Sequence, residues 1–195
     1  IRPGMVFGPD RNGDTIADLY VASRNSSEIL VFNVVASAQI GTGALFGAAD
    51  GLSGPTGLAL SPDMRYLYVA NRGLSQVLQL NLAFPGPGLA IIASNQNGLV
   101  GPEALAIDPV SGNLLVASTD SHQILGFTRI VSGVFEGVFD GTGVDGIRAL
   151  KMSFIDQQLY AAIVDPSNDD EVIIRRYNPT TGVESATPLF DGNLI

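Results

Sequence analysis

The chain has 195 residues, no cysteine, and 19 acidic against 10 basic residues, for a formal net charge of −9. This charge argues against nucleic-acid binding and against an anionic membrane surface, because both need clustered Lys and Arg side chains. The lack of cysteine excludes disulfides, thiol nucleophiles and thiolate metal sites, and no apolar run approaches the ~18–20 residues of a membrane span.

The first predicted elements are a short apolar segment, "MVFG", followed by the strands "DLYVAS" and "EILVFN". The same succession returns three more times. Its second strands are "YLYVAN", "NLLVAS" and "QLYAAI", and its third strands are "QVLQLN", "QILGFT" and "EVIIRRYN". A glycine-flanked or polar-flanked fourth segment closes each copy, namely "GALFG", "GLAIIAS", "GVFEGVF" and "ATPLF".

Four short strands that recur with a period of roughly 45 to 53 residues are typical of β-propeller blades. We therefore predict an all-β fold, a β-propeller of four-stranded antiparallel blades with four repeats in this chain. Residues 1–195 would form a single propeller or propeller segment, with blades at about 1–50, 51–97, 98–142 and 143–195.

The stretch "GPTGLALSPDMRYLYVANRGLSQVLQLNL" resembles YVTN-type and NHL-type propeller repeats. The resemblance implies the fold, and it does not choose a function, since propellers include binding modules, lyases, lactonases and surface-layer proteins. The final "LFDGNLI" is similar to the linkers between repeats, so the chain stops in phase. A four-bladed ring, part of a longer ring, or a protomer that continues head-to-tail into another chain all remain open.

The turn of the first repeat, "DRNGDTIADLY", is five residues longer than its counterpart in the second and is rich in acids. Five residues fall at positions 1, 3, 5, 7 and 9 of a loop: Asp10, Asn12, Asp14, Ile16 and Asp18. Calcium takes six to eight oxygen ligands, from carboxylates, amides and backbone carbonyls. The alternation therefore predicts a Ca²⁺ site in which Ile16 offers its carbonyl. A plain Asn-Gly hairpin turn with solvated acids is the alternative.

The loop resembles the calcium loop of FG-GAP and integrin-type blades, "D-x-N-G-D-G-x-x-D-L". It departs from that pattern at Thr15, where glycine is usual. Calcium-binding modules of extracellular proteins have dissociation constants of about 10⁻⁴–10⁻³ M, so such a site favours a location outside the cell.

Other candidates for chemistry are weaker. We predict that the acidic segment Asp165–Glu171 is a solvated loop, that His122 is a surface turn residue, and that "GTGVDG" at 141–146 is a linker. Arg24 and Arg72 occupy matching repeat positions and read as a solvated pair. The Asn25-Ser26-Ser27 glycosylation triplet carries little weight.

The leading hypothesis is a non-enzymatic, calcium-stabilised propeller at the cell surface or outside the cell. It would bind a protein or a glycan, or assemble with itself head-to-tail. The alternative is a propeller enzyme, a lyase or a lactone hydrolase, acting in the central channel. The inner segments "MVFG", "LALS", "LAID" and "LKMS" offer only Asp108 and Lys151 for that chemistry, which favours the first hypothesis.

Overall fold

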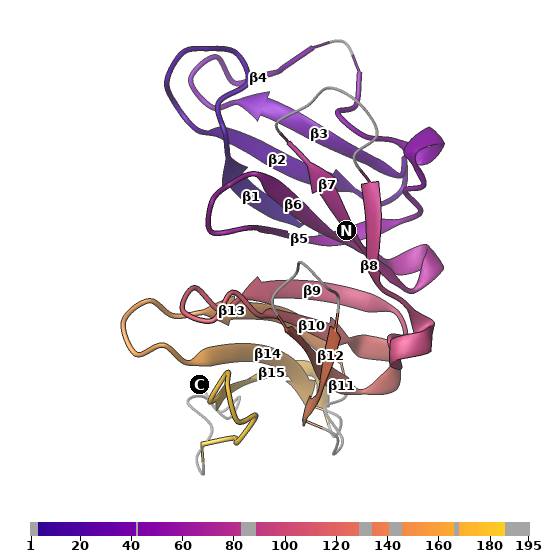
Figure 1. Cartoon of the computed structure of the whole chain (residues 1–195), viewed down its shortest axis with the longest axis vertical. Helices are drawn as coiled ribbons and strands as arrows, with labels where there is room; N and C mark the ends of the chain where they lie inside the picture. The colour runs from indigo at the N-terminus through magenta and orange to yellow at the C-terminus, as the bar shows by residue number, and fades with distance from the viewer. Residues whose placement is uncertain are drawn as a thin grey trace.

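The computed structural model describes residues 4–41, 43–82, 89–128, 134–140, 146–165 and 168–185. It shows four antiparallel sheets that follow one another along the chain (Figure 1). We call these sheets the first to fourth blades. The prediction of an all-β propeller with four-stranded blades is confirmed. No helix among these residues is long and apolar enough to cross a membrane.

Each blade adds its strands in chain order. The first contains β1 (Met5–Gly8), β2 (Asp18–Ser23), β3 (Glu28–Asn33) and β4 (Ala38–Gln39). The second contains β5 (Pro55–Leu60), β6 (Tyr66–Asn71), β7 (Gln76–Asn81) and β8 (Leu89–Ala93). The third contains β9 (Pro102–Ile107), β10 (Leu114–Ser118), β11 (Gln123–Thr128) and β12 (Val134–Asp140). The fourth contains β13 (Ile147–Met152), β14 (Leu159–Asp165) and β15 (Asn168–Tyr177).

Two of the predicted segments differ in the structure. The fourth strand of the first blade is not the continuous "GALFG": β4 lies earlier, and Phe46 adds only an isolated bridge to Ile29. The predicted solvated loop Asp165–Glu171 is also wrong in part, because β14 runs to Asp165 and β15 starts at Asn168. Within this acidic segment Asp165 pairs with Asn168. The predicted strand "ATPLF" lies outside the described residues.

Successive blades pack through three apolar cores. One lies between the first and second blades, one between the second and third, and one between the third and fourth. In the middle blades both faces of the second strand are apolar and buried, as in Leu67, Tyr68, Val69 and Ala70 of β6. A strand buried on both faces is a near-continuous apolar run, which explains why "YLYVA" shows no alternation.

The innermost strands β1, β5, β9 and β13 lie side by side along one groove, the inner groove. Gly57 of β5 allows this approach, because a Cβ atom there would lie 2.7 Å from the Glu103 carbonyl oxygen of β9. Glycine is used where two backbones come this close. All four blades thus present their first strands to a common surface, where the candidate site lies.

Candidate functional site

The inner groove has two chemically different ends. Where the inner strands begin, a hollow of about 220 Å³ is lined by the polar side chains of Thr56, Glu103 and Arg148. Where these strands finish, a hollow of about 570 Å³ is lined by apolar side chains that include Phe7, Met64 and Phe154. We call these the polar end and the apolar end.

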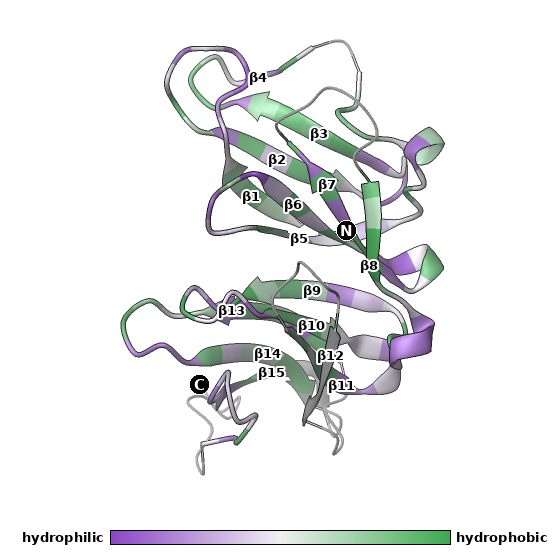
Figure 2. Ribbon diagram, viewed as in Figure 1, coloured by the Kyte–Doolittle hydropathy of each residue, from purple (hydrophilic) through white to green (hydrophobic). Residues whose placement is uncertain are grey.

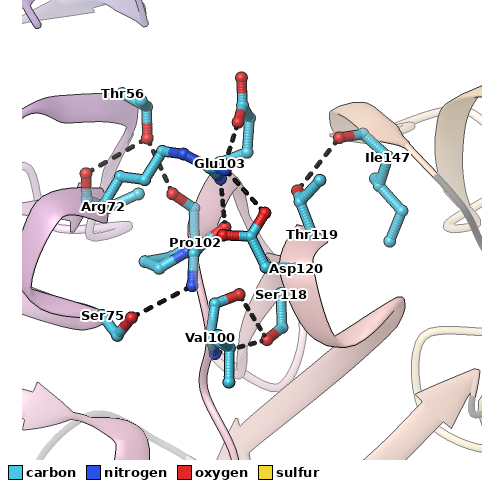
Figure 3. Close-up of polar contacts among 12 residues, drawn as sticks. Thr56, Arg72, Ser75, Val100, Pro102, Glu103, Ser118, Thr119, Asp120 and Ile147 are labelled. Atoms are coloured by element: carbon cyan, nitrogen blue, oxygen red, sulfur yellow. Dashed lines mark hydrogen bonds and ion pairs between the residues drawn. The ribbon is translucent and has the colours of Figure 1, made fainter.

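At the polar end, Arg72 of the second blade joins the third blade through three acceptors (Figure 3). It donates to the Gly101 carbonyl oxygen at 2.7 Å and to Asp120 Oδ1 at 2.7 Å, and its Nη1 lies 3.0 Å from Glu103 Oε2. The Glu103 side chain is only 11% exposed. Charge-assisted hydrogen bonds at this degree of burial are stronger than surface ion pairs. The prediction that Arg72 is solvated is therefore wrong, whereas Arg24 is exposed.

Threonine hydroxyls make further links between the blades. The Thr56 hydroxyl donates to the Pro102 carbonyl at 3.0 Å, and the Thr119 hydroxyl donates to the Ile147 carbonyl at 3.2 Å (Figure 3). Both hydroxyls are buried, and each satisfies a backbone acceptor at the start of the next inner strand. The polar end is thus largely occupied by bonds that hold blades together.

Sequence reasoning missed Glu103 and Arg148 as groove residues. They occupy equivalent positions, "E-A-L-A-I" and "R-A-L-K-M", and the predicted inner segments began one or two residues too late to include them. An alignment of the four repeats on their second strands gives the signal that finds them. Arg148 has a buried Nε without a hydrogen-bond partner among the described residues.

The two groove residues that sequence reasoning did select behave differently. Asp108 is 4% exposed and accepts bonds from the Val110 backbone and the Ser111 hydroxyl, so it holds a turn and does not line the groove. Lys151 does line the apolar end and is exposed. The prediction that Asp108 and Lys151 both line the groove is therefore wrong for Asp108.

The acidic loop of the first blade lies between β1 and β2 and is closed by its own hydrogen bonds. Asp10 accepts from the backbone N–H groups of Asn12, Gly13 and Thr15 at 2.7–2.9 Å. These bonds favour the ionised form and hold the pKa of Asp10 below its usual value, the Thr15 bond most of all. Asp63 accepts a backbone bond in the equivalent turn of the second blade, so this role for Asp10 needs no metal.

Asp14 and Asp18 are the added acids. The Ile16 N–H and then the Asn33 and Asn12 amides lower the pKa of Asp14. Asn12 Nδ2 lies 3.0 Å and Asn33 Nδ2 2.5 Å from Asp14 Oδ2. Asp18 is buried and accepts from the Arg11 N–H at 2.7 Å. Thr15 adopts a left-handed φ of 71°, the conformation that glycine supplies in the loops that this one resembles.

The loop contains the oxygen-bearing side chains that calcium prefers, but the Asp14 carboxylate accepts hydrogen bonds from the Asn12 and Asn33 amides. Within the described ranges, no three His, Cys, Asp or Glu side chains gather as a metal site. A cation at this loop would require the Asn12 and Asn33 amides to turn by half a rotation, so that oxygen replaces nitrogen beside Asp14. The calcium site stays a prediction.

The remaining candidates lie away from the groove. His122 is an exposed turn residue with a left-handed φ of 58°, as predicted, and the equivalent residues Ser27 and Ser75 share that conformation. The segment after the predicted linker is strand β13 and not a helix, which excludes a nucleotide-binding helix there. Residues 141–145 of that linker lie outside the described residues.

A third hollow, of about 480 Å³, lies between the turns of the second and third blades. Its walls include Asp63, Tyr66, Tyr68 and Gln79. Burial raises the pKa of Tyr68 to about 12, while Gln79 donates to its hydroxyl at 3.2 Å.

Comparison with known families identifies the family to which this propeller belongs. Residues 19–133, more than half of the chain, match the family described as Lactonase, 7-bladed beta-propeller. The chain belongs to this family. The match supports the propeller part of the resemblance to YVTN and NHL repeats. Among curated proteins, no sequence matches the chain.

Solved structures show the same fold at low identity. A chain in the crystal structure of a nidogen/laminin complex is similar with a TM-score of 0.69 and 16% identity, over 89% of this chain and 59% of that chain. Kuenenia stuttgartiensis hydrazine synthase is similar with a TM-score of 0.64 and 16% identity, over 88% of this chain and 45% of that chain. This member of the lactonase propeller family thus spans 59% and 45% of the length of these two structures.

Proposed function

We propose that this chain is a non-enzymatic interaction or structural module, built from propeller blades and working at the cell surface or outside the cell. Its partner would be a protein or a glycan, or another copy of itself. The single observation that carries this proposal is the state of the Glu103 carboxylate. It is the acid that lines the polar end of the inner groove, and it forms an ion pair with Arg72 at 3.0 Å.

A carboxylate held in this way is a poor general base. The adjacent guanidinium occupies one of its oxygens, which is then not free to accept a proton from a water molecule. Among the described residues, no group of acids and histidines could hold a metal ion that would act in place of Glu103. His122 lies in an exposed turn. The polar end is therefore better suited to holding the blades together than to catalysis.

The acidic loop supports the proposed location and the proposed stabilisation by calcium. The five inserted residues have no counterpart in the second blade, whose shorter turn closes with the side chains of Asp63 and Ser61. The added acids then need a different reason, and a divalent cation from the extracellular medium supplies one. We propose that calcium strengthens this loop and does not take part in chemistry.

Lactone hydrolysis is a second candidate, because the family that the chain belongs to is a lactonase family. If it occurs, the polar end is the place for it. Glu103 would orient a water molecule toward the lactone carbonyl, and Arg148 would stabilise the developing oxyanion. Water would add to the carbonyl carbon, the ring C–O ester bond would break, and the products would be a hydroxycarboxylate anion and one proton.

A pH-stat assay separates the two functions. The purified chain is mixed with glucono-1,5-lactone or with γ-butyrolactone, and proton release is compared with that of buffer alone. We expect no excess rate. An excess rate that Glu103→Gln abolishes, and that the matched surface change Glu184→Gln leaves unchanged, would overturn the non-enzymatic proposal. Equal melting temperatures of the variants would exclude loss of the fold as the cause.

A further inference from the structure

The third hollow lies between the second and third blades, beside the apolar end of the inner groove, with which it shares Ser61, Pro62 and Pro109. Its volume of about 480 Å³ falls within the roughly 300–1,000 Å³ of small-molecule sites. One wall comes from β6, β7 and the turn before β6, and the other from the turn at 109–112. The described residues that line it all belong to these two successive blades. We call it the interblade hollow.

Aromatic and polar side chains share one face of the second blade in this hollow. Tyr66 and Tyr68 are two residues apart in β6, and Tyr68 is directly opposed to Gln79 of β7. Residues at i and i+2 of a strand, and directly opposed residues, project from one face of a sheet. Asp63, in the preceding turn, adds a carboxylate. Among the described lining residues none is Lys, Arg or His, so the walls disfavour an anionic ligand.

Gln79 places a polar side chain where the first blade has an apolar one. Its equivalent is Val31, which is 3% exposed and belongs to the core between the first and second blades. In Figure 2, β7 accordingly has a hydrophilic band within it, whereas the middle of β3 is hydrophobic. An amide between two blades costs free energy unless it is hydrogen-bonded. Gln79 Nε2 donates to the Tyr68 hydroxyl at 3.2 Å, and no donor among the described residues bonds to its Oε1. This oxygen can accept a hydrogen bond from a ligand.

The Tyr68 hydroxyl also differs from its counterpart in the first blade. Tyr20 donates to the Pro9 carbonyl at 3.0 Å, and its ring lies so close to Gly8 that a Cβ atom there would be 2.7 Å from a ring carbon. Ser61 replaces that glycine in the second blade, so a ring in the same position would clash with the Ser61 Cβ atom. Tyr68 is 1% exposed, and no acceptor bonds to its own proton among the described residues. A ligand oxygen would supply that acceptor.

Asp63 provides an ionised acceptor in the same wall. The Ser61 hydroxyl and the Arg65 N–H both donate to its Oδ1, at 2.5 and 3.1 Å. These two bonds, the Ser61 bond first, hold the pKa of Asp63 below its usual value. Within the described ranges no donor bonds to Oδ2. Tyr66, which is half-buried, adds an aromatic ring to these polar groups.

We propose that the interblade hollow binds a neutral saccharide. Each sugar hydroxyl can donate one hydrogen bond and accept others. The hollow matches this with the Tyr68 hydroxyl as donor, and with Gln79 Oε1 and Asp63 Oδ2 as acceptors. The C–H groups on one face of a sugar ring pack on the ring of Tyr66. The inference rests on the interaction role proposed above, and it names a glycan as the partner.

Saturation-transfer difference NMR tests the proposal, with the methyl glycosides of glucose, galactose, mannose and N-acetylglucosamine as probes. We expect the chain to bind at least one of them, and to bind methyl glucuronide more weakly because its carboxylate is repelled by Asp63. Gln79→Val and Tyr68→Phe each remove one hydrogen-bonding group and should raise Kd about 3–10-fold. The first blade already has valine at the position of Gln79. Tyr20→Phe is the matched control, because it removes the equivalent hydroxyl from the first blade and should leave Kd unchanged.

Several outcomes overturn the saccharide site. One is that none of the four neutral glycosides binds. Another is a Kd that both substitutions in the hollow leave unchanged while their melting temperatures match that of the wild type. A third is that methyl glucuronide or choline binds more tightly than every neutral glycoside, which would indicate an ionic site. The lactone assay is independent of these results. Failure of glycoside binding without lactone turnover leaves the non-enzymatic role standing, whereas turnover that depends on Glu103 overturns that role and not the saccharide site.

Discussion

The Nη2 atom of Arg72 lies 2.7 Å from Asp120 Oδ1, although the two residues are 48 positions apart and belong to different blades. The same guanidinium reaches Glu103 and the Gly101 carbonyl. One side chain thus links the second blade to three groups of the third. This arrangement makes Arg72 a structural clamp at the polar end of the inner groove.

Replacing Arg72 by alanine should destabilise the chain by about 1–3 kcal/mol, because Glu103, whose side chain is 11% exposed, would lose its ion-pair partner. Arg24→Ala is the control at the equivalent position of the first blade. Arg24 is exposed, and its replacement should change the free energy of unfolding by less than about 0.5 kcal/mol. Urea unfolding measures both. Equal effects of the two substitutions would contradict the clamp.

Gly57→Ala should destabilise the contact between the second and third blades. The added Cβ would lie 2.7 Å from the Glu103 carbonyl oxygen and 2.9 Å from Ala104 Cα, and neither backbone atom can yield as a flexible side chain does. We expect a loss of about 1–3 kcal/mol. Gly43→Ala has no atom within 4 Å of its new methyl and should be neutral. Thermal melts compare them, and a neutral Gly57→Ala would mean that β5 and β9 lie farther apart.

The strands were predictable from sequence because the same strand pattern occurs in each of the four repeats. "DLYVAS" and "EILVFN" coincide with β2 and β3, residue for residue. The partners of Arg72 were not predictable in this way. Glu103 has no acidic equivalent in the other blades, and Asp120 has none in the first two, so the repeat does not mark them as partners of Arg72. Their contact depends on the distance between two blades, which the strand pattern of one blade does not contain.

The break in the fourth strand of the first blade has a local cause. Residues 34–39 are exposed, and Ser37 takes a left-handed φ of 50° within them. Asn33 accepts backbone bonds from Val35 and Ala36, at 2.8 and 2.6 Å. Such side-chain-to-backbone bonds compete with a sheet ladder, and apolar content alone does not reveal them.

The raised pKa of Tyr68 predicts how the free energy of unfolding changes at alkaline pH. Burial raises its pKa to about 12, whereas an unfolded tyrosine ionises near 10. The neutral form is favoured in the folded state, so this stabilisation is complete below pH 10 and is lost as the pH rises toward 12. Absorbance at 295 nm should show tyrosine ionisation near pH 12 that decreases by one residue in Tyr68→Phe. A transition near 10 for that residue would contradict its burial.

Calcium should raise the melting temperature of this chain if the acidic loop of the first blade holds the ion. At a concentration 100-fold above Kd, a bound ion stabilises the folded state by about 2.7 kcal/mol, or very roughly 5–11 °C for a chain of this size. Asp14→Asn should abolish the calcium-dependent increment, because it removes a charge from the centre of the loop. Asp63→Asn changes the equivalent turn of the second blade, which has no added acids, and should keep the increment whatever it does to the starting value. Melts in calcium and in chelator measure both variants. If calcium leaves the wild type unchanged, the loop is ordered by its own hydrogen bonds, which include those from Thr15 and Ile16 to Asp10 and Asp14.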